Sequence, residues 1–272
     1  MPPTVRLEYR DVTMQFAGGG QKAFTAVSEV SFSMRDREIV SLIGPSGCGK
    51  STLLNIGAGL LAPSAGAAFV DGERVTGPNA HVAIMLQKDL LLPWRTVMEN
   101  VLFGAEIQGV ARDERRARAQ ALLAAFNLTE FAGHYPYQLS GGMRQRAALA
   151  RTLAVDPSVL LLDEPFSAVD AQTRMVLQRD LALTLQRERK TALLITHDLL
   201  EAVTLSDRVL VMSRRPGRII DEIEIALPER DNPLARRQDA KVQGYVARLM
   251  DRLDIGSTAD RSAPRAAGQD SV

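Results

Sequence analysis

Cysteine is almost absent from this sequence, and neither sign of charge prevails. The single Cys48 cannot form an intrachain disulfide, which indicates a reducing compartment such as the cytoplasm. The 33 Lys and Arg residues nearly balance the 32 Asp and Glu residues, and the net charge of +1 supplies no long-range field toward nucleic acid or anionic lipid. Nucleic acid is therefore not an expected partner.

Long apolar runs are missing as well. Arg6, Glu8 and Arg10 precede any long apolar stretch, which argues against a cleaved secretory signal. The longest uncharged run, residues 51–70, is long enough to raise the question of a membrane span, but Pro63 and three glycines interrupt it. We expect a helix, a turn and the start of a strand there.

What is present is the composition of an ordinary globular protein. Of the 272 residues, 46% are hydrophobic and 24% are charged, which fits neither a collagenous nor a largely disordered chain. The length corresponds to roughly two domains, or to one large domain with an inserted subdomain.

The hydrophobic pattern predicts two kinds of strand. Residues 5–16 and 27–34 flank a glycine turn at residues 18–20, and their pattern predicts antiparallel strands. Short apolar runs are typical of buried parallel strands. Such runs occur at residues 39–43, 159–162 and 193–196.

Helical patterns occupy the middle of the chain. Residues 96–154 indicate an inserted helical subdomain, because they are rich in Ala, Arg and Leu and contain helix-start signals. The composition of residues 256–272 cannot bury enough apolar surface to offset ordering entropy, so we expect a disordered tail. Further helices are expected at residues 51–60, 171–189, 199–205 and 236–253, and further strands at 208–212 and 219–225.

A phosphate-binding loop is predicted at residues 44–52, which read G-P-S-G-C-G-K-S-T and match G-x-x-x-x-G-K-[ST]. The loop lies between an expected buried strand and an expected helix, which is the required context. Glycines let consecutive backbone N–H groups turn toward phosphate oxygens, Lys50 can reach the outer phosphates, and Ser51 can bind Mg²⁺. We assign the cradle to Gly44, Pro45, Ser46, Gly47, Cys48, Gly49, Lys50, Ser51 and Thr52.

Two adjacent carboxylates end a later strand, where residues 159–164 read V-L-L-L-D-E. Asp163 suits the shell of Mg²⁺, which it would hold through water, and Glu164 suits orientation or deprotonation of an attacking water. An apolar strand ending in acids is common, so this pattern alone leaves a structural role open.

Further motifs point to a family. Residues 139–145 read L-S-G-G-M-R-Q, which resembles the signature motif of ATP-binding cassette (ABC) ATPases, and S-A-V-D at 167–170 and T-H-D at 196–198 follow in the family's order. The resemblance covers roughly residues 5–225. It implies an α/β fold of the P-loop NTPase, ABC ATPase type, with a mixed sheet core, an antiparallel β entrance and an inserted helical subdomain.

The resemblance implies roles for residues outside the loop. Phe16 resembles the aromatic that stacks on adenine, and Phe24 is a weaker competitor for that role. Gln87 matches the glutamine that touches Mg²⁺ and the attacking water and senses the transporter subunit. His197 resembles the histidine that contacts the γ-phosphate. ATP and Mg²⁺ are the implied cofactors.

The resemblance also implies a homodimer. In this family one phosphate loop faces one signature only across a head-to-tail pair, so two ATP molecules would be buried at the interface. Asp170 resembles the residue that crosses this interface and couples the two sites. The γ-phosphate of ATP on one copy would be held by Ser140, Gly141 and Gly142 of the other.

A further motif narrows the family. Residues 90–95 read L-L-L-P-W-R, which resembles ATPase subunits of nitrate, sulfonate and taurine importers. The implied partners are integral membrane permease subunits and, indirectly, an extracytoplasmic solute-binding protein. The implied location is the cytoplasmic face of the inner membrane. Trp94, the only tryptophan, is compatible with a groove that receives the membrane subunit.

The resemblance divides the chain into segments. We expect a RecA-like nucleotide-binding core in two parts, at 1–95 and 155–225, and the first part includes the antiparallel β subdomain. A helical signature subdomain is expected between them, at 96–154. A C-terminal helical extension at 226–255 and the tail at 256–272 would follow.

Three alternatives remain at this stage. The first is a soluble ABC-type ATPase of DNA repair, chromosome structure or translation, the second is a P-loop kinase or GTPase, and the third is a cassette that binds ATP only to regulate.

Two smaller features also lead to expectations. Gly57 inside a helix should cost up to about 1 kcal/mol relative to Ala, without a functional account. The pairs Arg214-Arg215 and Arg236-Arg237 are interpreted as solvated charges.

Overall fold

The structure is a computed structural model that describes residues 4–17, 23–167 and 169–255. The expected glycine turn at residues 18–20, Ala168 within the motif 167–170 and the expected tail at 256–272 lie outside the described residues. Within the described part of the chain, every helix is too short or too polar to cross a bilayer.

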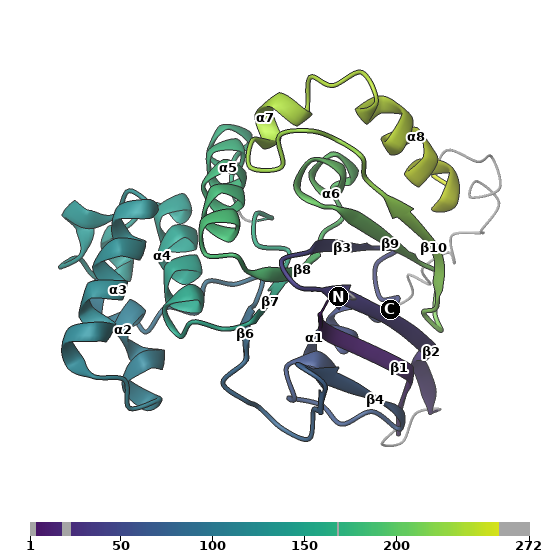
Figure 1. Cartoon of the computed structure of the whole chain (residues 1–272), viewed down its shortest axis with the longest axis horizontal. Coiled ribbons are helices and arrows are strands. Elements are labelled where there is room, and N and C mark those ends of the chain that lie inside the picture. The colour runs from purple at the N-terminus through teal and green to yellow at the C-terminus, as the bar shows by residue number, and fades with distance from the viewer. Residues whose placement is uncertain (1–3, 18–22, 168, 256–272) are drawn as a thin grey trace, which may run out of the picture.

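The larger sheet forms the centre of the molecule, as Figure 1 shows. Its strand order is β10-β9-β3-β8-β7-β6, and every neighbouring pair is parallel except β10 with β9. The sheet consists of β3 (Ile39–Ile43), β6 (Val82–Met85), β7 (Val159–Asp163), β8 (Thr191–Ile195), β9 (Arg208–Met212) and β10 (Ile219–Glu224). The buried parallel strands expected from the three apolar runs are confirmed as β3, β7 and β8.

The smaller sheet is antiparallel, with the order β2-β1-β4-β5. Helix α1 (Lys50–Gly57) packs between the two sheets, because Leu53, Leu54 and Ile56 join one hydrophobic cluster with strands of both. The strands are β1 (Val5–Phe16), β2 (Phe24–Arg35), β4 (Ala65–Val70) and β5 (Glu73–Arg74). The antiparallel entrance expected from the alternating pattern is confirmed.

Gly57 ends α1 where the two sheets come together. The helix was expected to continue to residue 60, but it ends at Gly57. A Cβ at this position would lie 2.2 Å from the hydroxyl of Tyr9, which donates a hydrogen bond of 2.8 Å to the carbonyl of Leu53. The absent side chain therefore makes room for a buried tyrosine, which accounts for a glycine that the sequence left unexplained.

Helices α2 (Val97–Ile107), α3 (Arg112–Ala125) and α4 (Gly141–Ala154) lie together on one side of the larger sheet (Figure 1). Thr96 and Glu99 form a capping box that starts α2. Helix α4 contacts α2 and α3 on one side and β6 and α5 (Ala171–Arg187) on the other, so it joins the helical block to the sheet. Two 3₁₀ turns connect the block, at Thr129–Phe131 and Pro136–Gln138.

Helices α6 (Leu199–Leu205), α7 (Pro233–Arg236) and α8 (Val242–Arg252) lie together beside β9 and β10. The expectation of one helix over residues 236–253 is wrong, because α7 ends at Arg236 and α8 begins six residues later. Arg236 is only 3% exposed and donates to the carbonyls of Leu227, Pro228, Thr204 and Ser206. Its interpretation as a solvated charge is therefore wrong: it fastens α7 to the core.

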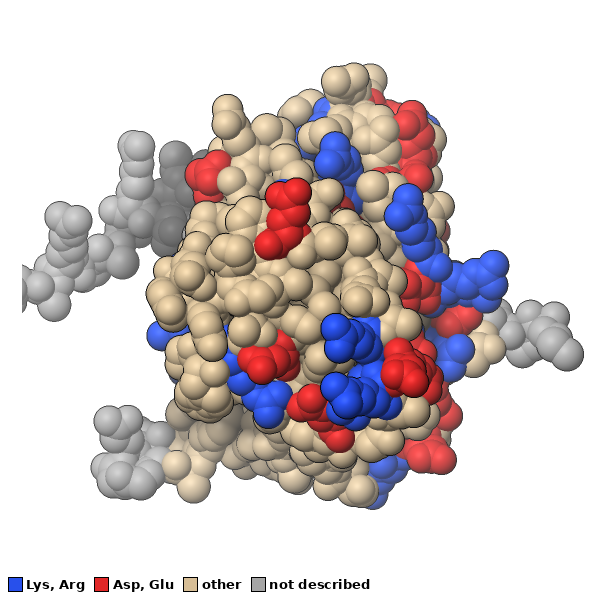
Figure 2. Space-filling view, turned by 90° about the vertical axis from the view of Figure 1, so that its left-hand side faces the viewer, with Lys and Arg blue, Asp and Glu red and all other residues tan. Residues whose placement is uncertain are grey.

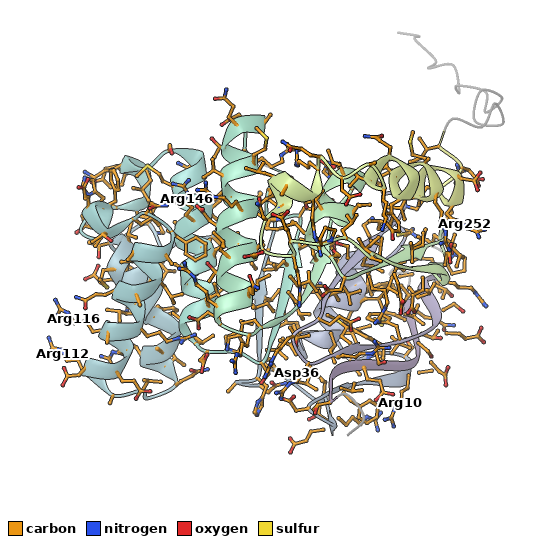
Figure 3. All side chains as sticks on the ribbon, turned by 45° about the horizontal axis from the view of Figure 1, so that its top comes forward. Arg10, Asp36, Arg112, Arg116, Arg146 and Arg252 are labelled. Atoms are coloured by element: carbon orange, nitrogen blue, oxygen red, sulfur yellow. The ribbon has the colours of Figure 1, made fainter. Side chains whose placement is uncertain are left out.

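Charged side chains of both signs are present on the helical side of the molecule (Figure 2). In Figure 3, Arg112 and Arg116 extend from α3, while Arg10 and Arg252 lie on distant parts of the molecule. Figure 2 shows that on the helical side of the molecule Lys and Arg alternate with Asp and Glu around a broad uncharged area.

Candidate functional site

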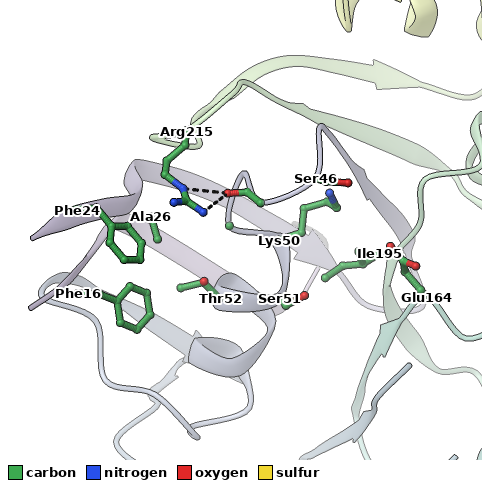
Figure 4. A pocket seen from close by; sticks show the side chains of 12 residues that line it. Phe16, Phe24, Ala26, Ser46, Lys50, Ser51, Thr52, Glu164, Ile195 and Arg215 are labelled. Carbon is green, nitrogen blue, oxygen red and sulfur yellow. Dashed lines mark hydrogen bonds between the residues drawn. The ribbon is translucent and has the colours of Figure 1, made fainter. Parts of the chain in front are cut away.

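A cavity of about 310 Å³ lies beside the loop that joins β3 to α1 (Figure 4). Strand β2, the end of β8 and the turn after β9 complete its walls. Eight of the residues that the sequence analysis selected line it: Phe16, Ser46, Gly47, Gly49, Lys50, Ser51, Thr52 and Glu164. Four others also line it: Phe24, Ala26, Ile195 and Arg215.

The loop backbone has the conformation that glycine permits. Gly47 and Gly49 have φ values of +74° and +106°, and a Cβ on Gly49 would lie 2.3 Å from Val27. No side chain caps the N-terminus of α1, so its first N–H groups remain available to an anion. Cys48 is 1% exposed and packs in the cluster between the sheets, where it acts as a small core residue.

Lys50 is folded back onto its own loop. Its ammonium donates to the carbonyls of Gly44 and Pro45 at 2.7 and 3.1 Å. These bonds place the charge over the loop before any phosphate arrives, and phosphate oxygens are stronger acceptors that can take the same donors. Gly44 and Pro45 therefore accept hydrogen bonds from Lys50 through their carbonyls and do not line the cavity themselves.

The two carboxylates at the end of β7 differ in surroundings. Burial raises the pKa of Asp163, and neighbouring Glu164 adds to the rise, while a hydrogen bond from Ser51 and the charge of Lys50 oppose it. Glu164 has a φ of +46°, an uncommon conformation for a residue with a side chain, and its N–H donates to the carbonyl of Ile195 at 2.9 Å. Such strain is concentrated at functional sites.

Glu164 is contacted from both neighbouring strands. Gln87, two residues beyond β6, donates to its carboxylate at 3.3 Å, and Nδ1 of His197, two residues beyond β8, lies 3.2 Å from the same oxygen. Because parallel strands end at the same edge of a sheet, the order β8-β7-β6 brings these three side chains together. Gln87 also donates to Ser167, which the sequence analysis did not select.

The residues at this edge fit Mg²⁺. Ser51, Asp163 and Gln87 offer oxygen ligands, which this ion prefers, and Ser51 already bonds to Asp163. Residues 4–17, 23–167 and 169–255 contain no group of three or more His, Cys, Asp or Glu side chains that could hold a metal alone. Mg²⁺ commonly takes one or two carboxylates and completes its shell with water and phosphate oxygens, a role that Asp163 and Ser51 suit.

An aromatic wall closes the far end of the cavity. The rings of Phe16 and Phe24 are 5.4 Å apart and tilted by 30°. This spacing leaves no room for a base between them, so a base would stack on their cavity side. Phe24, the weaker candidate from the sequence, lines the cavity together with Phe16.

The signature residues do not reach this cavity. Ser140 caps α4 by accepting a bond from the N–H of Met143, and Asp170 caps α5 by accepting from the N–H groups of Gln172 and Thr173. Gly141 is the first residue of α4. A separate hollow of about 250 Å³ is lined by Ser140, Gly142, Met143, Arg146, Gln172, Thr173 and Val176.

Arg215 makes a contact that the sequence analysis did not anticipate. It is exposed, as expected of a solvated charge, but it also lines the cavity and donates twice to the carbonyl of Gly47. Only the adjacent arginine, proline and glycine marked a turn there, and a turn sequence does not show which loop it will meet. Arg237 is half-buried and likewise has a partner that the sequence did not indicate, because it donates to Gln178 of α5 at 2.8 Å.

Comparisons with known proteins agree with this geometry. The sequence model of the ABC transporter family matches residues 27–167. The chain is 46% identical over 223 residues to the uncharacterized ABC transporter ATP-binding protein MJ0412 of Methanocaldococcus jannaschii, covering 82% of this chain and 83% of that protein. It is 43% identical over 251 residues to the taurine import ATP-binding protein TauB of Rhizobium johnstonii, covering 91% and 96%.

A solved structure is similar throughout the described core. The dimeric post-hydrolysis state of the ATP-binding cassette MJ0796, bound to ADP and Pi, is 30% identical in sequence and superposes with a TM-score of 0.71. The match covers 80% of this chain and 98% of that chain.

Proposed function

The chain belongs to the ABC transporter ATP-binding family, and from this premise we propose that it is the subunit that energises an importer for a small anionic solute, of the nitrate, sulfonate or taurine kind. Proteins of this family are ATPases coupled to transport, and they bind ATP with Mg²⁺. The observation that carries the catalytic part is the meeting of Gln87, Glu164 and His197 at the cavity that holds Lys50.

The residues of the cavity and of the adjoining strand ends have distinct tasks in the proposed hydrolysis. The loop N–H groups and Lys50 would bind the β- and γ-phosphates, and Ser51, with Asp163 acting through water, would hold Mg²⁺. Glu164 orients the attacking water and accepts its proton, while Gln87 and His197 keep that carboxylate at the edge of the sheet. Mg²⁺, when bound, neutralises charge on the phosphate oxygens.

Dimerisation follows from the separation of the two halves of the site. The hollow at Ser140 and the cavity at Lys50 are distinct on one chain, so a γ-phosphate can contact both only if the hollow belongs to a second copy. The helix N-terminus at Ser140 is suited to an anion. We infer a head-to-tail homodimer that ATP closes and hydrolysis reopens, which supplies the two states that drive transport.

A groove next to the catalytic residues suits a membrane partner. A hollow of about 550 Å³ is lined by Gln87, Lys88, Asp89, Leu90, Gln145 and Ser167, and it shares Gln87 with the catalytic edge. Leu90, which lines the hollow, is 54% exposed, and Trp94, four residues further along the chain, is 71% exposed. We assign this surface to the permease, which would place the chain at the cytoplasmic face of the inner membrane, with a solute-binding protein acting on the other side.

Replacement of the proposed base tests the catalytic assignment. Glu164→Gln should lower kcat by about 10²- to 10⁴-fold because the amide cannot accept the proton, while ATP binding is kept. ATP hydrolysis and the Kd for ATP should be measured on the same preparation. Glu224→Gln, on the exposed side of β10, is the matched control and should leave both values unchanged. A normal hydrolysis rate in Glu164→Gln would show that another group is the base.

The solute is tested separately. Cells that lack this chain should lose uptake of radiolabelled nitrate, sulfonate or taurine, and the wild-type chain, but not Glu164→Gln, should restore it. Full uptake of all three solutes without the chain would reject the solute class and leave the ATPase assignment intact.

A further inference from the structure

The turn between β9 and β10 reaches the phosphate loop from a distant part of the sequence. Two backbone hydrogen bonds fix it to β2: the N–H of Gly217 donates to the carbonyl of Ala26 at 2.9 Å, and the N–H of Ser28 donates to the carbonyl of Gly217 at 3.0 Å. Arg215 extends from this turn, and Figure 4 shows its side chain between Phe24 and the loop. The turn thus forms a third wall of the ATP cavity.

Arg215 contacts the two other walls at once. Its Nε and Nη2 atoms donate to the carbonyl of Gly47 at 3.1 and 3.0 Å. Its guanidinium carbon lies 4.7 Å from the centre of the Phe24 ring, and Phe24 in turn packs against Phe16. A planar guanidinium is suited to this double role, because it can donate along its edge while its face stacks on an aromatic ring.

The bonds to Gly47 fix a peptide plane of the phosphate loop. Gly47 has a φ of +74°, and the next peptide bond carries the N–H of Cys48. Because a peptide unit is rigid, fixing the Gly47 carbonyl also fixes the direction of that N–H. A loop held in one conformation before ligand arrives loses less entropy when it binds phosphate.

We propose that Arg215 is a positioning residue of the ATP site, which holds the phosphate loop in its binding conformation and adds a second positive charge to the wall of the cavity that Lys50 lines. The inference rests on the proposed ATP site and deepens it. The part of the ligand that depends on Arg215 is the polyphosphate chain, because the two bonds end on the loop that receives phosphates. The base is affected less, since Phe16 and Phe24 keep their places on β1 and β2.

Equilibrium binding to the full-length chain tests this role. Arg215→Ala should raise the Kd values of ATP, ADP and inorganic triphosphate alike, by about 5- to 20-fold, as expected for loss of charge-assisted hydrogen bonds at an exposed site. The kcat at saturating ATP should change less than about twofold, because the loop binds ground state and transition state equally. Arg215→Lys keeps the charge without the planar edge and should fall between Arg215→Ala and the wild type.

Arg218→Ala is the matched control. Arg218 lies on the same turn but donates to Glu29 and Ser28, and it does not line the cavity. The Arg218→Ala substitution should leave all three Kd values within about twofold of the wild-type values. Thermal unfolding of Arg215→Ala and Arg218→Ala without nucleotide shows whether either variant has lost its fold.

Three results would overturn the proposal: unchanged Kd values in Arg215→Ala, an equal loss in Arg218→Ala, or a loss confined to ATP and ADP with inorganic triphosphate unaffected. The last result would place the effect on the aromatic wall. Lys50→Ala separates this test from that of the ATP site itself, because it should weaken all three ligands whether or not Arg215 has the proposed role. If Lys50→Ala also binds normally, the ATP site has been placed wrongly.

Discussion

Glu201 is a buried carboxylic acid beside Glu164 and His197, with which it lines a small hollow. Its side chain is 3% exposed and accepts a hydrogen bond of 2.9 Å from Gln178, and its backbone N–H donates to Asp198, the neighbour of His197. Burial raises its pKa to about 7 and the charge of Asp198 adds to the rise, while the bonds from Thr196 and Gln178 and the charge of Arg174 oppose it. The group is therefore protonated in part near neutral pH.

This residue makes the stability of the protein pH-dependent. Between the ordinary value of 4.5 and about 7 the folded state binds more protons than the unfolded state, so the stabilisation from Glu201 is complete below pH 4.5 and is lost as pH rises to 7. The difference corresponds to about 3 kcal/mol. Urea unfolding at pH 5 and pH 8 should show Glu201→Gln gaining up to that amount over the wild type at the higher pH.

The control for this prediction is Glu73→Gln, which changes an exposed carboxylate on β5. Its difference from the wild type should be the same at both pH values. If the difference between Glu201→Gln and the wild type is also constant from pH 5 to pH 8, Glu201 does not titrate in this range in the folded protein.

At the scale of the element, α1 shows how local preference and packing compete. Gly57 lowers the helix propensity of α1, yet a side chain there would overlap the Tyr9 hydroxyl and lie 3.5 Å from Leu161 of β7. The helix that carries Lys50 and Ser51 is thus fitted between two sheets at its C-terminal end. Packing of α1 against Tyr9 of β1 therefore favours glycine at position 57, because the close atomic overlap of a side chain there outweighs the gain in helix propensity.

A double-mutant cycle measures this competition. Gly57→Ala should lower the free energy of unfolding by about 1–3 kcal/mol, as for other overpacked cores. In a Tyr9→Phe background the nearest atom is gone, so the same change should cost at least about 1 kcal/mol less. The measurement is urea unfolding of the four chains. An equal cost in both backgrounds would mean that Tyr9 does not limit the space at Gly57.

At the scale of the whole molecule, the two hollows that we propose as halves of the ATP site are separate on one chain. The cavity at Lys50 is built by β2, α1, β7 and the turn after β9, while the hollow at Ser140 is built by the first turns of α4 and α5. Helix α4 is packed against both β6 and α5, which holds the hollow at Ser140 on the helical side of the sheet. The site as proposed would be completed by a second copy.

Mixing two inactive chains tests the shared site. Lys50→Ala and Ser140→Ala should each hydrolyse ATP poorly, and mixed dimers of the two should regain one site made of an intact loop and an intact signature. Random exchange of subunits makes half of the dimers mixed, so the mixture should reach at most about a quarter of wild-type activity. The control mixes Lys50→Ala with a chain carrying both substitutions, which restores no site. Absence of any recovery in the first mixture would reject opposed sites.

The sequence by itself determined the elements that depend on local pattern. The runs of apolar residues fixed β3, β7 and β8, because buried parallel strands need apolar side chains on both faces. The spacing of glycines with Lys50 predicted the phosphate loop, because this spacing lets the backbone surround a phosphate before a helix starts. The order of motifs supplied the family. The roles of single residues remain predictions that the experiments above test.

Only the tertiary structure decided contacts between distant segments. Arg215 meets Gly47 across 168 positions of sequence although it stays exposed, and Arg236, interpreted as a solvated charge, enters the core. The single helix expected over residues 236–253 is broken for the same reason: α7 is fastened to the core by Arg236, and α8 packs separately on α6. Local pattern specifies which side chains can be buried, whereas the partner that a buried charge finds depends on how the strands are ordered in space.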